Sequence, residues 1–168
     1  MKNLTIIAAV AQNGAIGYKG GLIYKLAADM QHFRRATMGH TVLMGRLTFE
    51  SLPKGALPHR RNMVLTRSKS FSAEGVERFS SMADALAATT PDEEVYVIGG
   101  ASLYAEAMAW ATRLLITHVE HTPKDADVFF PHIDEQTWHC VAREYHAADA
   151  DNEQAFVIAE YEKTDDTE

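Results

Sequence analysis

The hydrophobic pattern of this chain consists of short apolar runs separated by glycine, proline and polar residues. Residues 4–11 are almost continuously apolar, which is typical of a strand buried on both faces. The lengths of the apolar runs, and the glycine, proline and polar residues that bound them, predict strands in seven further segments of the chain. These strands are expected over residues 41–44, 62–66, 76–79, 95–98, 114–120, 138–146 and 155–163.

Helices are predicted between the strands. The longest runs from residue 26 to 37, where four side chains recur at the spacing of one buried helical face: Leu26, Met30, Phe33 and Thr37. Ser81 is a suitable N-cap for a shorter helix, with Asp84 three residues later. The three shorter helices are expected over residues 46–52, 81–88 and 102–109. The glycine-rich residues 13–21 predict a mobile loop.

Strands alternate with helices early in the chain and follow one another at its end. This order predicts one α/β domain over residues 1–163, which suits a length of 168 residues. We expect a central, mixed, mostly parallel eight-stranded sheet with an antiparallel C-terminal edge, flanked by about four helices. Residues 164–168 are expected to form an acidic, frayed tail.

The net charge of −7 argues against a nucleic-acid partner, because phosphate contacts need a basic face. The acidic excess lies in residues 149–168, which hold eight acidic residues and one lysine. Residues 30–70 instead hold eight cations and one glutamate, a net charge of +7. Such a block fits an unevenly charged surface or a site for an anionic small molecule, and composition does not decide between them.

Cysteine content and hydropathy bear on the compartment. The single cysteine, Cys140, permits no internal disulfide, which suits a reducing cytoplasm. No apolar run approaches the ~20 residues of a membrane helix. Residues 6–11 are short for a signal peptide and are followed by Gln12 and Asn13, so we interpret them as a strand.

Several common catalytic motifs are missing from the sequence. It has no G-x-G-x-x-G fingerprint, no Walker loop, no G-x-S-x-G elbow and no HExxH motif. His118 and His121 flank Glu120, but on a strand they point to opposite faces and cannot chelate together. No metal site is expected, and the eight histidines are expected on the surface or in packing.

Strand–glycine–helix turns are the first candidate feature. Gly99 and Gly100 separate a predicted strand from a helix, and Gly45 does the same before Arg46. Glycine allows close approach of a ligand, and the free N–H groups of a helix start favour phosphate. Together with Thr66 and Arg67 after a third strand, these turns favour a phosphate ligand over plain turn chemistry.

Asp29 and the 57–62 loop are the other candidates. Asp29 in the first helical turn could simply stabilise the helix dipole. It also shares a face with Phe33, however, which would suit a carboxylate inside a pocket. The basic loop could be ordinary surface, or one of its arginines could turn inward to a substrate carboxylate. The remaining cations, Arg34, Arg35, Arg61 and Lys69, are expected to be plain surface.

Taken in order, these motifs resemble those of the dihydrofolate reductase family, from about residue 4 to residue 163. The resemblance rests on seven segments. They are Ile6-Ile7-Ala8-Ala9 with Ile16-Gly17, Leu26-x-x-Asp29-Met30-x-x-Phe33-x-x-x-Thr37, Val42-Leu43-Met44-Gly45-Arg46-x-Thr48-Phe49-Glu50-Ser51-Leu52, Leu57-Pro58-x-Arg60-x-Asn62, Ile98-Gly99-Gly100-Ala101-x-Leu103-Tyr104, Thr117-His118 and Asp127-x-x-Phe130-Pro131.

The resemblance implies an NADPH-dependent enzyme that reduces 7,8-dihydrofolate to 5,6,7,8-tetrahydrofolate and feeds one-carbon metabolism. Hydride would pass to C6 of the pterin and a proton to N5. It also implies a cytoplasmic monomer, a known antifolate target, with no membrane or nucleic-acid partner. The implied catalytic residues are Asp29, Tyr24 and Thr117.

The same resemblance implies two sets of binding residues. Arg60 would bind the α-carboxylate of the glutamate tail, and Arg46 and Arg67 the 2′-phosphate of NADPH. The substrate set is Ile7, Ala9, Leu22, Asp29, Phe33, Leu52, Leu57, Arg60, Ile98 and Thr117. The cofactor set is Ala9, Ile16, Gly17, Gly45, Arg46, Thr48, Leu65, Thr66, Arg67, Gly99, Gly100, Ala101, Ser102, Leu103 and Tyr104.

The resemblance further implies a cis Gly99–Gly100 bond and a lid over residues 13–24. We hypothesise that Asp29 is the only ionisable side chain near the pterin, that burial raises its pKa, and that water delivers the proton. The chain departs from the family pattern in four places. These are Ile23-Tyr24 in place of Pro-Trp, Ala27 in place of a frequent proline, Leu47 in place of a basic or polar residue, and Ser102 in place of an occasional arginine.

Three other functions are compatible with these residues. A related pterin or pyrimidine reductase of the same fold would turn over a deaminated ribityl-pyrimidine instead of dihydrofolate. A folate- or nucleotide-binding protein without catalysis would not oxidise NADPH. An acidic interaction domain would use residues 149–168 and has only charge in its favour.

Overall fold

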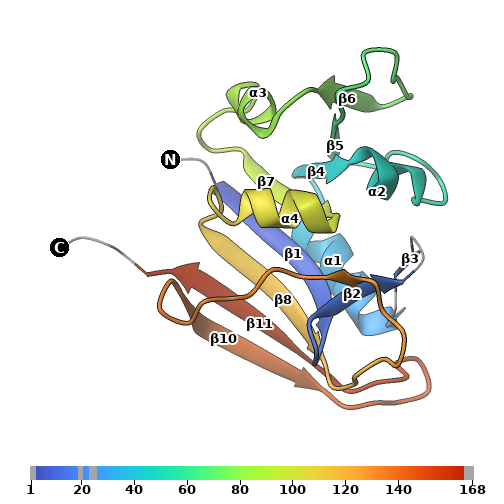
Figure 1. The fold of residues 1–168 in the computed structure, drawn as a ribbon, viewed down its shortest axis with the longest axis vertical. Helices are drawn as coiled ribbons and strands as arrows, with labels where there is room; N and C mark the ends of the chain where they lie inside the picture. Colours follow the sequence, from blue (N-terminus) through green and yellow to red (C-terminus); the bar gives the residue numbers. More distant parts are fainter. Residues whose placement is uncertain (1–2, 19–20, 23–25, 165–168) are drawn as a thin grey trace.

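The computed structural model describes residues 3–18, 21–22 and 26–164 (Figure 1). Its main sheet has eight strands, and their bounds lie close to those expected. They are β1 (Asn3–Ala11), β4 (Thr41–Gly45), β5 (Arg61–Leu65), β6 (Val76–Phe79), β7 (Glu94–Gly99), β8 (Arg113–Val119), β10 (Trp138–His146) and β11 (Phe156–Lys163). The order across the sheet is β10-β11-β8-β1-β7-β4-β5-β6.

The pairing directions confirm the mixed sheet. β1 pairs in parallel with both β7 and β8, and β4, β5 and β6 continue the parallel part. β11 runs antiparallel to β8 and to β10, which forms the C-terminal edge. The carboxyl ends of six parallel strands, β1, β4, β5, β6, β7 and β8, therefore share one edge, where ligands bind in open α/β sheets.

Four helices accompany the sheet in the described part of the chain: α1 (Ala27–Thr37), α2 (Arg46–Glu50), α3 (Met82–Ala87) and α4 (Ala101–Ala107). The expected cap of α3 is present, because the Ser81 hydroxyl accepts a hydrogen bond from the Asp84 amide at 3.1 Å. All four expected helices are confirmed, although the start or the end of each helix lies one or two residues from its predicted position.

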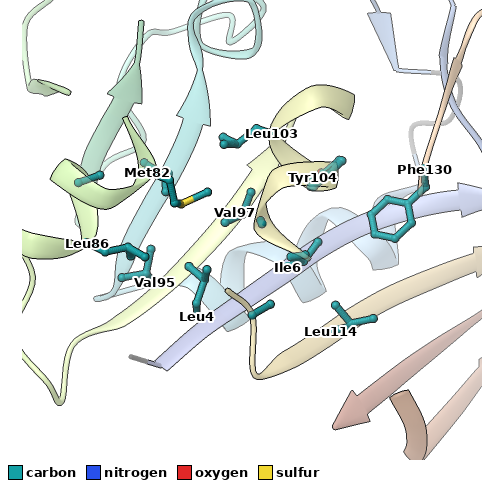
Figure 2. Packing of buried hydrophobic residues seen from close by; sticks show 14 of the residues in the cluster. Leu4, Ile6, Met82, Leu86, Val95, Val97, Leu103, Tyr104, Leu114 and Phe130 are labelled. Carbon is teal, nitrogen blue, oxygen red and sulfur yellow. The ribbon is translucent and has the colours of Figure 1, made fainter. Parts of the chain in front are cut away.

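Alternating side chains of the strands build two apolar layers. Leu4 and Ile6 of β1 pack with Met82 of α3 and Leu103 of α4 on one face of the sheet (Figure 2). Ile7 points to the other face and joins a cluster that includes the half-buried Phe33 of α1. Each buried aliphatic side chain of this size contributes roughly 1.5–3 kcal/mol. The sheet thus lies between α1 and the α3–α4 pair.

The expected buried face of α1 is wrong at one position. Leu26 and Thr37 are buried and Phe33 is half-buried, but the Met30 side chain is 60% exposed. Met30 is rotated about 100° from Asp29 around the helix axis, so it falls at the margin of the face that α1 turns to the sheet.

The glycine-rich stretch is not simply a loop. It contains β2 (Ala15–Tyr18) and β3 (Gly21–Leu22), which form a small sheet with β9 (Val128–Phe129) in the order β3-β2-β9. The Phe130 amide adds a hydrogen bond to the Gly14 carbonyl at 2.8 Å. The partner strand lies more than a hundred residues later, where no local pattern reveals it.

Arg61 is not the plain surface cation that was expected. Its guanidinium donates to Glu77 of β6 at 2.6 Å and to Glu93 at 3.0 Å. Thr41 also donates to Glu93. These hydrogen bonds lower the pKa of Glu77 and, against the cost of burial, that of Glu93, while the two carboxylates raise the pKa of Arg61.

Two further expectations concern the ends and surroundings of the chain. The predicted tail over residues 164–168 lies outside the described residues apart from Thr164. In the described part of the chain, no helix is both long and apolar enough to cross a membrane.

Candidate active site

Asp29 and Thr117 meet where α1 crosses the sheet. The Thr117 hydroxyl of β8, which is buried, donates to Asp29 Oδ1 at 2.5 Å. The start of α1 is fixed from far away in the chain, because Asn152 Oδ1 accepts a hydrogen bond from the Ala28 amide at 3.0 Å. Leu26, the N-cap residue, offers no such side-chain bond. The loop before β11 therefore sets the position of Asp29.

The surroundings of Asp29 favour a carboxylate inside a pocket over an acid that only stabilises the helix dipole. Burial raises the pKa of its carboxyl, and the Thr117 hydrogen bond together with His32 and His146 opposes that rise. An acid that only stabilised the helix dipole would face solvent and need no partner on the sheet. Asp29 is instead a half-buried carboxylate with a fixed hydrogen-bond donor.

Apolar side chains expected around the substrate come together near this carboxylate. Five of the predicted residues lie in a single cluster on the α1 face of the sheet: Ile7, Phe33, Leu52, Leu57 and Ile98. Ala9 is half-buried on β1 and pairs in register with Thr117. Leu22 belongs to β3, but its side chain is not described, and Tyr24 lies outside the described residues.

Two strand–glycine–helix turns lie against each other at the carboxyl edge of the sheet. The Gly99–Gly100 peptide bond is cis, as the resemblance implied, and Gly99 has a φ of +137°. A Cβ on Gly99 would lie 3.2 Å from Thr48 Oγ1, and one on Gly45 would lie 3.9 Å from the Gly99 carbonyl oxygen. Only glycine fits Gly99 without displacing its neighbour.

These turns have features that suit a phosphate-bearing cofactor. Gly45 and Gly100 are the N-caps of α2 and α4, and neither helix start is capped by a side chain. Tyr104 is buried and donates to the Ile7 carbonyl at 2.9 Å, which ties α4 to β1. Burial raises the pKa of Tyr104, so its hydroxyl stays a donor.

The remaining predicted cofactor residues surround the same edge. Thr66 and the exposed Arg67 follow Leu65 at the end of β5. Ile16 and Gly17 belong to β2, and Ala101, Ser102 and Leu103 form the first turn of α4. Arg46 already pairs with Glu50 at 3.1 Å and lies 5.1 Å from the Phe71 ring centroid, which offsets its unfavourable place at a helix start.

Arg60 is the arginine of the 57–62 loop that turns inward. Its Nη1 donates to Thr37 Oγ1 at 3.0 Å and its Nε to the Pro58 carbonyl at 2.9 Å. Burial and the neighbouring Arg34 lower the pKa of Arg60. Asn62 shapes the loop by bonding both the amide and the carbonyl of Leu57.

The hypothesis that Asp29 is the only ionisable side chain near the pterin stays a prediction, although Asp29 itself has titratable neighbours. His32 of α1 and His146 of β10 both interact electrostatically with it. His32 was expected on the surface or in packing. The available signal was its position three residues after Asp29, which places both side chains on one helical face. The contribution of His146 depends on tertiary structure alone.

Comparison with known proteins identifies the family. The family model for dihydrofolate reductase matches residues 3–163. The chain belongs to the dihydrofolate reductase family. Dihydrofolate reductase type 3 of Salmonella typhimurium is 41% identical over 152 residues, which cover 90% of this chain and 93% of that protein. Dihydrofolate reductase of Mycobacterium tuberculosis strain H37Rv is 44% identical over 142 residues, covering 82% and 85%.

A solved member of the dihydrofolate reductase family has the same fold. The enzyme from Enterococcus faecalis, complexed with NADP(H) and RAB-propyl, matches with a TM-score of 0.90 at 32% identity. The match covers 97% of each chain, so the sheet order and helix placement described above are those of the family.

Proposed function

We propose that Asp29 and Thr117 hold the pterin ring while the enzyme carries out the reaction of its family, the NADPH-dependent reduction of 7,8-dihydrofolate to 5,6,7,8-tetrahydrofolate. The Asp29–Thr117 hydrogen bond carries this assignment. With one carboxylate oxygen oriented by Thr117, the carboxylate can accept two hydrogen bonds from the pterin 2-amino group and N3. The apolar cluster around Phe33 then covers the ring face.

The chain's residues divide the chemical work. NADPH supplies the hydride that reduces C6 of the pterin. Asp29 orients the ring and polarises it toward protonation at N5, for which water is the donor. The side chains of Ile7 and Phe33 exclude bulk water from one side of the ring. In this proposal no other side chain donates the N5 proton, and Tyr24 remains an assignment implied by resemblance.

The cofactor assignment is supported by the backbone at the carboxyl edge. The missing Cβ atoms at Gly45, Gly99 and Gly100 let two strand–helix turns pack closely together, and the uncapped starts of α2 and α4 in these turns offer backbone N–H groups to a pyrophosphate. Arg67 is exposed next to this edge and would meet the 2′-phosphate. Arg46 would reach the same phosphate by giving up its bond to Glu50, which, being exposed, is worth under about 1 kcal/mol.

Replacement of the pocket carboxylate tests the proposed function. The measurement is the loss of NADPH absorbance on addition of dihydrofolate, repeated with NADH in place of NADPH. Asp29→Asn keeps the shape of the side chain and is expected to lower kcat/KM by roughly a hundredfold or more at neutral pH. Asp84→Asn, in the first turn of α3, is the matched control and should leave activity unchanged. Full activity in Asp29→Asn would refute the assignment.

We further propose that the enzyme works in the cytoplasm as a monomer and binds no nucleic acid. The single cysteine and the acidic net charge support these assignments. Cell fractionation, sedimentation at micromolar concentration and a DNA-binding titration at low salt would check the three parts separately.

A further inference from the structure

His32 combines burial with an unused polar atom beside Asp29. It follows Asp29 by three residues on α1, which places the two side chains one turn apart on one helical face. Its Nε2 is buried, and within residues 3–18, 21–22 and 26–164 it is the only buried side-chain nitrogen or oxygen without a hydrogen-bond partner. Such an atom costs free energy and calls for an explanation.

Charged groups approach His32 from two elements. On α1 these are Asp29 and Arg35, and on β10 they are Glu144 and His146. The two β10 residues form a hydrogen bond, with His146 Nε2 2.8 Å from Glu144 Oε2. His32 therefore interacts with the carboxylate inside the site and also with a hydrogen-bonded pair nearer the solvent.

Asp29 is subject to charges from the same groups. His32 and His146 act on it, and the buried Tyr104 of α4 interacts with it. Thr117 of β8 contacts the carboxylate but carries no charge. Burial lowers the pKa of His32 while Asp29 opposes that change, so the charge on each group affects the protonation of the other.

We propose that His32 is a positioning residue for dihydrofolate reduction: the charge of its imidazole acts across one turn of α1 on the carboxylate that holds the pterin. This inference rests on the proposed role of Asp29. With no hydrogen-bond partner on Nε2, the structure shows nothing that holds His32 in one protonation state. When His32 gains a proton in acid, its charge favours the ionised form of Asp29.

The direction of the effect follows from the signs of the charges. Protonated His32 keeps Asp29 ionised as the pH falls, so the site remains competent further into the acidic range. In His32→Gln the carboxyl takes up its proton at a higher pH. The acidic limb of the kcat/KM profile then moves upward, and activity at its acid end falls roughly three- to tenfold relative to the unaltered enzyme.

A pH profile with a matched histidine control provides the first test. His32→Gln and His139→Gln make the same chemical change, but His139 is exposed on β10 and takes no part in the cluster. The inference expects a shifted acidic limb in the first variant only, with kcat at neutral pH little changed. Identical profiles in both variants would overturn it.

A second measurement leaves His32 in place. The ring C–H signals of His32 are titrated by NMR in the ligand-free enzyme and in Asp29→Asn. Loss of the carboxylate should lower the titration midpoint of His32, and an unmoved midpoint would overturn the coupling. If Asp29→Asn keeps its activity while the midpoint falls, the proposed function fails and the coupling stands.

Discussion

The Thr117 hydroxyl on β8 donates to the Asp29 carboxylate on α1, across a separation of 88 residues. The bond favours the ionised carboxyl and so lowers the pKa that burial raises. Because the donor comes from the central part of the sheet, the carboxylate orientation depends on the pairing of β1 with β8.

Thr117→Val removes this donor and preserves the shape of the side chain. The pKa of Asp29 should rise further, so the acidic limb of the kcat/KM profile should move to higher pH. The free energy of unfolding should fall by about 1 kcal/mol. Thr112→Val, at the opposite end of the sheet, is the control for the same chemical change. Equal pH profiles for both variants would show that the hydroxyl has no electrostatic role.

Arg60→Leu should weaken binding of dihydrofolate without slowing the chemical step. A hydrogen bond between charged groups contributes roughly 1.5–3 kcal/mol, so KM should rise roughly ten- to a hundredfold. A dihydropterin without the glutamate tail tests the cause, because its kcat/KM should be the same in both enzymes. An equal loss with the truncated substrate would place the effect of Arg60 elsewhere, for example in its bond to Thr37.

Gly99→Ala should raise KM for NADPH and reduce stability. Its φ of +137° is rarely adopted by L side chains, and the added Cβ would press on Thr48. Gly55→Ala is a suitable comparison, since its φ is +73° but nothing lies within 4 Å of the added atom. We expect about 1 kcal/mol of destabilisation at position 55 and about twice that at 99. A KM change in Gly55→Ala alone would contradict the assignment of the cofactor edge.

Arg61→Leu should destabilise the fold by about 1–3 kcal/mol at neutral pH with little change in kcat. The folded-state pKa values of Glu77 and Glu93 lie below 4.5, so their ion pairs contribute above that pH. The contribution is lost as the pH falls through the folded-state values. Urea unfolding should therefore show a smaller difference between variant and parent at pH 3 than at pH 7. Arg143→Leu, at an exposed position on β10, serves as the control.

Local patterns predicted the strands and the general position of the site. Apolar runs located the strands that are largely buried, such as β1, β4, β7 and β8, and the Asp29–Phe33 spacing put a carboxylate on an apolar helical face. Both patterns depend only on residues that are close together in the sequence. They predict burial correctly wherever the periodicity of a strand or helix decides which side chains are buried.

The missed features all depend on contacts between distant segments. Asn152 holds the start of α1 from 124 residues away, and β9 pairs with β2 over a similar separation. The partners of Arg61 lie on β6 and before β7, which gave no sequence signal of their own. The predicted burial of Met30 was wrong because this residue lies at the margin of a helical face, where a small rotation of the helix decides whether a side chain is exposed.

The place of β1 in the sheet has a consequence for synthesis of the protein. Asn3 of β1 pairs with Glu94 of β7, and Thr5 of β1 pairs with Arg113 of β8. During synthesis, β1 is therefore made about a hundred residues before either of its neighbours in the sheet. Until then both of its hydrogen-bonding edges are open to other chains. β11, inserted between β8 and β10, arrives last of all. We therefore expect nascent chains that lack β11 to hold an exposed apolar sheet and to rely on chaperones until that strand has been synthesised.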